Sequence, residues 1–111
     1  MRIVSMALVW GLAAGCVAPA AVRDGLQHEL EDLRLLEAQV LPLIPDGPPV
    51  DFGGGTSYRP RDGWRLQLRA MQLRAASLVA WAHDVVFDQE AAYQTLLMPA
   101  LAEAKKNAEG E

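Results

Sequence analysis

The segment between Gly63 and Pro99 most constrains the fold, because it holds no internal glycine or proline and repeats its apolar residues with a helical period. Apolar side chains recur there at alternating spacings of four and three residues, the pattern of a helix with one continuous apolar seam. The seam consists of Trp64, Leu68, Met71, Ala75, Leu78, Ala82 and Val85. The pattern predicts one long helix over residues 62–98, with a second possibility that Asp88 caps a separate helix beginning at Gln89.

A second row of mostly apolar residues runs along the same segment. It consists of Leu66, Ala70, Leu73, Ser77, Ala80, Asp84 and Phe87. Positions 64 and 66 are about 200° apart on a helix, so the two rows lie on opposite sides and need two packing partners. We expect the first helix to cover the Trp64 side, and Leu66, Leu73 and Phe87 to meet a partner protein or a second copy. Trp64 and Trp81 lie at positions that most often belong to a core. Trp64, beside the preceding loop, is also a candidate contact with a partner's pocket or a membrane interface.

An earlier helix is predicted over residues 24–41. Asp24 is followed three residues later by Gln27, the signature of a capping box at a helix start. Behind it, Leu26, Leu30, Leu33 and Val40 lie on one face, and Pro42 ends the pattern.

Residues 42–63 break every periodicity, with five prolines and five glycines. We interpret them as a Pro/Gly-rich loop. The run Gly53–Ser57 lacks the Gly-Lys-Ser/Thr ending of a phosphate-binding loop and is interpreted as a turn. Pro99 is expected to kink the long helix or to open a short C-terminal helix over 99–108. The predicted fold class is therefore all-α: a helical hairpin of long amphipathic helices preceded by an N-terminal hydrophobic signal or anchor helix.

The N-terminus carries one positive charge, Arg2, followed by an uncharged run from Ile3 to Val22. A basic residue, an apolar stretch and then small residues are typical of an export signal. Within this run, residues 12–16 are Leu-Ala-Ala-Gly-Cys, which resembles the lipobox of bacterial lipoprotein signal peptides. The resemblance implies a signal peptide over 1–15, a covalent lipid (palmitate) on Cys16 as the only attached group, and a lipidated tether over 16–23.

Two alternatives for this segment remain open. The Ala18-Pro19-Ala20 pattern allows ordinary cleavage and secretion, and residues 3–22 are long enough to stay as an uncleaved membrane anchor. The lipoprotein interpretation predicts a bacterial cell-envelope protein that faces the periplasm, with membrane lipid as one partner and the outer membrane favoured over the inner.

Catalytic and metal chemistry find little support in the sequence. The segment from His28 to Asp32 has an aspartate where a metalloprotease helix has its second histidine. A helix carrying His83, Asp84, Asp88 and Glu90 offers too few ligands for a metal. The chain's two histidines and three serines form no nucleophile–base motif. We therefore expect neither an enzyme, a metal site nor a small-molecule substrate.

Charge separates the two predicted helices. Residues 59–74 hold five arginines against one aspartate, a net charge of +4, while residues 24–37 hold five acids against one arginine, a net charge of −4. The basic patch consists of Arg59, Arg61, Arg65, Arg69 and Arg74. In an antiparallel hairpin, Glu37 faces the start of the second helix and its arginines, which favours a structural role. Anionic lipid headgroups are the second interpretation, and nucleic acid is not expected, since aromatic residues do not interleave with the arginines.

These features predict a structural or assembly subunit, tethered through Cys16, of an envelope complex or a homo-oligomer. Small size, a lipobox and a Pro-rich stretch also resemble phage lysis lipoproteins of the outer-spanin kind. A single-span accessory subunit of a membrane complex and a periplasmic binding module are further hypotheses.

Overall fold

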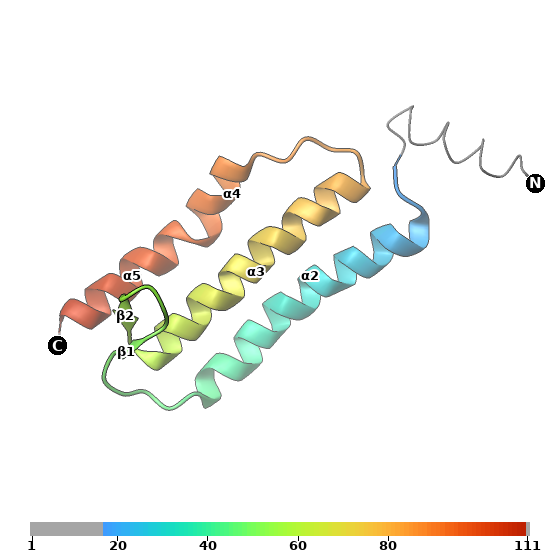
Figure 1. Cartoon of the computed structure of the whole chain (residues 1–111). Coiled ribbons are helices and arrows are strands. Elements are labelled where there is room, and N and C mark those ends of the chain that lie inside the picture. Colours follow the sequence, from blue (N-terminus) through green and yellow to red (C-terminus); the bar gives the residue numbers. More distant parts are fainter. Residues whose placement is uncertain (1–16, 111) are drawn as a thin grey trace, which may run out of the picture.

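The computed structural model describes residues 17–110, and the described chain is mostly helical, which confirms the all-α class. The central helix lies between one helix on one side and two shorter helices on the other, so that the helices form a single layer (Figure 1). In chain order the elements are α2 (Ala20–Val40), a 3₁₀ turn (Leu41–Leu43), β1 (Val50–Asp51), β2 (Ser57–Tyr58), α3 (Pro60–Ala82), α4 (Gln89–Leu96) and α5 (Met98–Glu109).

Helix α2 begins four residues before the predicted start at residue 24. Pro19 is its N-cap residue, and no side chain caps it. Alanine is the strongest helix former, and Ala20 and Ala21 extend the helix ahead of Asp24, so the predicted capping box does not mark the N-terminus. The helix ends near Pro42 as expected, because proline has no amide N–H to continue the helical hydrogen bonds.

The predicted single helix over 62–98 is wrong, because α3 ends at Ala82. His83 closes the helix, and Asp84 adopts a left-handed backbone with φ of 56°. Aspartate is one of the few residues besides glycine that adopt this conformation readily. The His83 ring nitrogen Nδ1 lies 2.9 Å from the Val79 carbonyl, which also accepts a hydrogen bond from the His83 backbone N–H at 3.1 Å.

After this turn the chain folds back along α3. The carboxylate of Asp88 accepts a hydrogen bond from the Ala91 N–H at 3.0 Å and caps α4, which is the alternative that the sequence allowed. Pro99 then lies in the first turn of α5, so it opens a last helix, as one of the two expectations held. The observed bounds of α5, Met98–Glu109, differ from 99–108 by one residue at each end.

The loop over 42–63 contains a small antiparallel hairpin in which Val50 pairs with Tyr58 and Asp51 with Ser57. Gly53, Gly54 and Gly55 form its turn with φ of 116°, 67° and 80°, a conformation that glycine adopts without strain. The hairpin folds onto α3 so closely that a Cβ at Gly63 would overlap the Phe52 ring. A glycine in the first turns of α3 therefore makes room for the hairpin.

The core is narrow and built largely of small residues. Its buried apolar side chains are Leu30, Leu41, Leu68, Ala75, Ala82, Ala100 and Ala104. Alanines at helix contacts let the helix backbones approach closely. Each such contact buries little apolar area, so polar pairs carry part of the cohesion between helices.

The N-terminal end of the described chain is attached to the end of α3. The Ala18 N–H donates to the Ala82 carbonyl at 2.8 Å, and the Arg23 guanidinium donates to the Ala18 carbonyl at 2.7 Å. The predicted signal peptide over 1–15, Cys16 and residues 3–16 of the possible anchor lie outside the described residues, whereas residues 20–23 of the predicted tether belong to α2. Among residues 17–110, no helix is both long enough and apolar enough to cross a bilayer.

Candidate functional site

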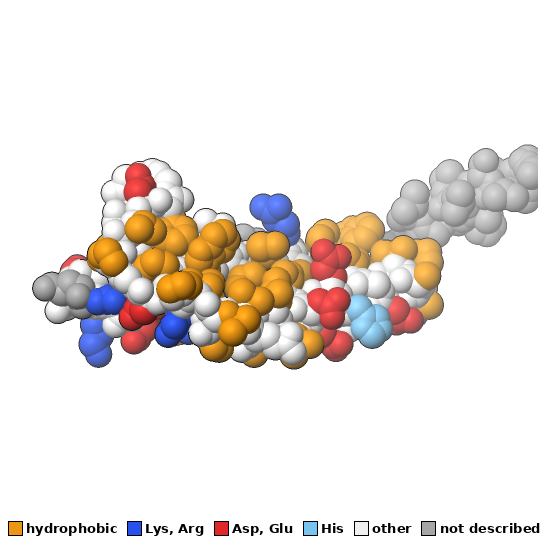
Figure 2. Space-filling model, turned by 90° about the horizontal axis from the view of Figure 1, so that it is seen from below, with side chains coloured by type: hydrophobic (Ala, Val, Ile, Leu, Met, Phe, Trp, Pro, Cys, Tyr) orange, Lys and Arg blue, Asp and Glu red, His pale blue; other side chains and the backbone are white. Residues whose placement is uncertain are grey.

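The most prominent surface feature is a row of exposed apolar side chains on α3. Trp64, Met71 and Leu78, spaced seven residues apart, are 48%, 51% and 43% exposed. We call these three residues the apolar stripe. Figure 2 shows a broad group of hydrophobic side chains next to the protruding hairpin and a further group near the N-terminal end, with acidic side chains between the two. Exposed apolar groups gathered in this way mark interaction sites more often than scattered ones do.

The stripe is half of the apolar seam that the sequence predicts. Of the other seam residues, Leu68, Ala75 and Ala82 are buried, whereas Val85 lies beyond the end of α3 and is exposed. Residues four apart on a helix differ by about 40° in direction, so α2 covers one half and leaves the other half at its edge. Along α2 itself, Leu30 is buried, whereas Leu36, about 120° around the helix from Leu30, is exposed.

The hairpin shields one end of the stripe. The rings of Phe52 and Trp64 meet edge to face, with centroids 6.0 Å apart and planes at 88°. Phe52 and Tyr58 from the hairpin and Leu66 and Met71 from α3 line an open hollow of about 460 Å³ beside this contact. The Trp64 side chain is thus held in place although half of it is exposed.

The partner surface predicted at Leu66, Leu73 and Phe87 requires correction. All three residues are half-buried, and α4 and α5 pack along α3. The Arg69 guanidinium, on the same side of α3 as Leu73, bonds to the Leu96 carbonyl at 2.9 Å. The prediction failed because it assumed that only glycine or proline turns the chain back. Of the four predicted interface residues, Trp64 is the one that remains exposed.

Glu37 is the centre of the polar contacts between α2 and α3. Its carboxylate accepts hydrogen bonds from the Arg69 Nε at 2.8 Å, from the Arg69 Nη2 at 3.0 Å and from the Gln72 Nε2 at 2.8 Å. The Arg65 Nε lies 3.8 Å away. This is the pairing that the opposite charges of the two segments predict, and such a two-pronged arginine–carboxylate contact fixes orientation as well as distance.

The surroundings of Glu37 also set its ionisation. Burial raises the pKa of this carboxyl, but hydrogen bonds from Arg69 and Gln72 and the charges of Arg69 and Arg65 outweigh burial, so the pKa is lowered. The charged form is therefore favoured within the fold.

The basic patch does not form one free surface. The Arg59 guanidinium contacts Asp46 at 3.2 Å, Arg61 donates to the Ile44 carbonyl at 2.8 Å, and Arg65 contacts Asp62 at 3.2 Å. Arg59 and Arg61 lie at the N-terminal end of α3, whereas the chain from Cys16 joins the fold at the C-terminal end. The geometry thus argues against headgroup binding by these arginines beside an anchor. Arg74 is exposed.

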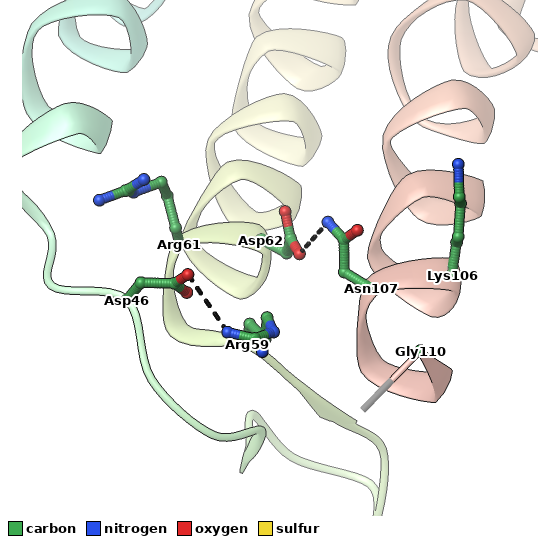
Figure 3. Close-up of a pocket in the computed structure, with 7 residues that line it drawn as sticks. All are labelled: Asp46, Arg59, Arg61, Asp62, Lys106, Asn107 and Gly110. Atoms are coloured by element: carbon green, nitrogen blue, oxygen red, sulfur yellow. Dashed lines mark hydrogen bonds and ion pairs between the residues drawn. The ribbon is translucent and has the colours of Figure 1, made fainter.

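A polar hollow of about 480 Å³ lies where the loop after α2, the start of α3 and the end of α5 meet. In Figure 3, Asp46 faces Arg59 and Asp62 faces Asn107, while the Arg61 and Lys106 side chains point away from the hollow. Asp62 is buried and accepts from Asn107 at 2.8 Å. These groups pair with one another rather than converge on a ligand, so we interpret the hollow as a joint between elements.

Sequence reasoning missed the exposure of Met71 and Leu78, because periodicity shows which residues share a face but not how wide the covering helix is. It also missed Trp81, Val85 and Val86, which are exposed at the end of α3. The available signal was the apolar run that follows Asp84.

Within residues 17–110, no three His, Cys, Asp or Glu side chains gather where a metal ion could bind. In comparisons with known proteins, no family, no curated protein and no solved structure matches this chain.

Proposed function

We propose that this chain is a structural or assembly subunit of a bacterial cell envelope, tethered to a membrane at its N-terminus and joined to a second copy through the apolar stripe. The exposure of Trp64, Met71 and Leu78 on one helix is the observation that carries the proposal. A helical surface with a seven-residue repeat packs well against another helix of the same repeat.

The tether is supported by the lipobox-like sequence at Cys16 and by the path of the chain. Only Val17 separates Cys16 from Ala18, which is bonded to Ala82 at the end of α3. A lipid on Cys16 would therefore hold the body close to the membrane by the end where α2 begins.

Tethering makes a second copy the partner that the stripe fits best. Copies anchored in one leaflet at the same residue share one orientation and one height above the membrane. A two-fold axis along the membrane normal then brings each stripe residue opposite its own counterpart. Met71, in the middle of the stripe, meets Met71 of the second copy, and methionine adapts readily to such a contact.

Cysteine cross-linking of membranes that contain the full chain tests this arrangement. We expect Met71→Cys to give a cross-linked dimer under mild oxidation. Leu35→Cys is the matched control, since Leu35 is 54% exposed but lies on α2 instead of in the apolar stripe of α3. The parental chain, whose lone cysteine is Cys16, gives the background. Equal cross-linking at positions 35 and 71, or none above the parental chain at position 71, would contradict a parallel dimer.

The tether has its own test. Cys16→Ser should prevent lipidation, and it should therefore leave unprocessed precursor and abolish retention by the membrane. Intact-mass spectrometry should find lipid on the parental chain. A parental chain that begins at Ala21 and carries no lipid would refute the lipoprotein assignment.

A further inference from the structure

Exposed apolar side chains gather at the end of the body where the N-terminal segment joins it. Trp81, Val85 and Val86 are 66%, 59% and 94% exposed, and we call these three residues the apolar tip. The end of α3 and the start of α2 lie at the same end of the molecule, away from the hairpin and the C-terminus (Figure 1). Val17 and Val22, at the start of the described chain, are exposed as well.

The packing of the fold does not account for these side chains. Val86 is almost wholly exposed, so it contributes little to the core. The turn that carries it needs only the left-handed Asp84 and the capping Asp88. A polar residue at Val86 would serve the same turn at no cost in buried area. An apolar tip therefore calls for a contact outside the fold.

We propose that the apolar tip inserts into the interfacial region of the lipid bilayer to which the chain is tethered. This inference rests on the proposed membrane tether. The hydrogen bond from the Ala18 N–H to the Ala82 carbonyl holds the tip beside the incoming chain. Cys16 is two residues from Ala18, and two residues span at most about 7 Å. That reach matches the headgroup layer, which is about 5–7 Å thick on each side of the hydrocarbon core.

The chemistry of the tip suits a neutral interface rather than an anionic one. A tryptophan offers an apolar ring and one N–H, the combination that is enriched at membrane interfaces. The charged groups nearby are mainly acidic, because Asp84 and Asp88 flank the valines and the Arg23 guanidinium is bonded to the Ala18 carbonyl. We therefore expect zwitterionic lipid to suffice, with no gain from anionic lipid.

Insertion at this end would place the C-terminal end of α3 at the membrane and its N-terminal end away from the membrane. Trp64 lies 17 residues before Trp81 on the same helix, about 25 Å at 1.5 Å per residue. The hairpin and the far end of the apolar stripe would then stay clear of the lipid. Trp64 and Trp81 thus report on the two ends of α3.

Two single-tryptophan forms of the full chain test the proposal in phosphatidylcholine vesicles with brominated acyl chains, which quench tryptophan on contact. Both forms carry Trp10→Phe. One keeps Trp81 through Trp64→Phe, and the other keeps Trp64 through Trp81→Phe. We expect several-fold stronger quenching at Trp81 than at Trp64, with the same result when phosphatidylglycerol is added.

A charge at the tip provides a second variant. In the Trp81-only form, Val86→Asp should reduce the quenching by more than half and leave flotation with the vesicles unchanged. Val50→Asp, at an exposed valine of the hairpin, should change neither.

The outcomes separate the tip from the tether. A chain that floats with the vesicles but is quenched equally at both tryptophans, or at neither, would refute tip insertion and leave the tether intact. Failure of the parental chain to float would remove the tether and overturn both proposals.

Discussion

Removing the Glu37 carboxylate should weaken the fold more than any change on the outer face of α2. In the Glu37→Ala variant, Arg69 loses two hydrogen bonds and Gln72 loses one, at 2.8 Å, 3.0 Å and 2.8 Å in the native fold. Arg69 keeps its bond to the Leu96 carbonyl, so its charge stays at the contact between α2 and α3 without a counterion. The penalty therefore comes from the stranded partners more than from Glu37 itself.

The expected size follows from the partial burial of the pair. Breaking a fully buried ion pair costs about 3–5 kcal/mol. The Glu37 and Arg69 side chains are 15% and 26% exposed, so water compensates part of the loss. We expect the free energy of unfolding to fall by about 2–3 kcal/mol. This is a large share of the stability of a small domain.

Urea denaturation of the full chain in mild detergent, followed by far-UV circular dichroism, measures this loss as a lower midpoint at unchanged slope. Glu31→Ala is the matched control on the same helix. The Glu31 side chain is 55% exposed and lies 4.0 Å from His28, so its removal should change stability by less than about 0.5 kcal/mol.

Equal stability of the Glu37→Ala and Glu31→Ala variants would refute the reasoning. A double-mutant cycle with Arg69→Ala then locates the energy, because a direct pair gives a coupling of about 1–2 kcal/mol while independent sites give none.

Two further predictions follow from the structure. The fold lowers the pKa of Glu37 below the ordinary value of a glutamate. Its stabilisation is therefore complete above the unfolded pKa and is lost as the pH falls through the folded pKa. Acid titration of urea midpoints should show this loss in the parental chain and a shallower one in Glu37→Ala. Gly63→Ala should expel the Phe52 ring and shift the fluorescence emission of Trp64. Gly25→Ala is the control, because Gly25 has open space around it in α2; it should leave the emission unchanged and raise the free energy of unfolding by up to about 1 kcal/mol. An unshifted Trp64 spectrum in Gly63→Ala would contradict the close packing of the hairpin.

The sequence predicts the parts of the fold that local chemistry determines. Proline favours one backbone state, so Pro42 ends α2, and Pro99 opens α5, which is one of the two expectations for that residue. The cap of α4 by Asp88 was the alternative to the predicted single helix. The contact of Glu37 with the arginines of α3 was also predictable, because opposite charges on two antiparallel helices leave few other registers.

The parts that depend on tertiary packing were not predictable in this way. The end of α3 at Ala82 has no glycine or proline, and its signal is an aspartate in a left-handed turn. The return of the chain along α3 depends on Ala100 and Ala104, whose small side chains give no strong amphipathic pattern although both are buried. The hairpin strands are two residues each, too short to show an alternating pattern. The interface prediction at Leu66, Leu73 and Phe87 failed for these reasons.

The hydrogen bond between Ala18 and Ala82 also decides how the body responds to mechanical force. Because α2 and α3 run antiparallel, a pull on residue 17 while α3 is held acts along the axis of α2. The bond to Ala82 and the Arg23 clamp on the Ala18 carbonyl yield first. The interface between α2 and α3 is then loaded in shear, so that the contacts of Leu30 and the Glu37–Arg69 pair must break together instead of one helical turn at a time. The fold therefore resists tension from its N-terminal side through the full length of the contact between α2 and α3.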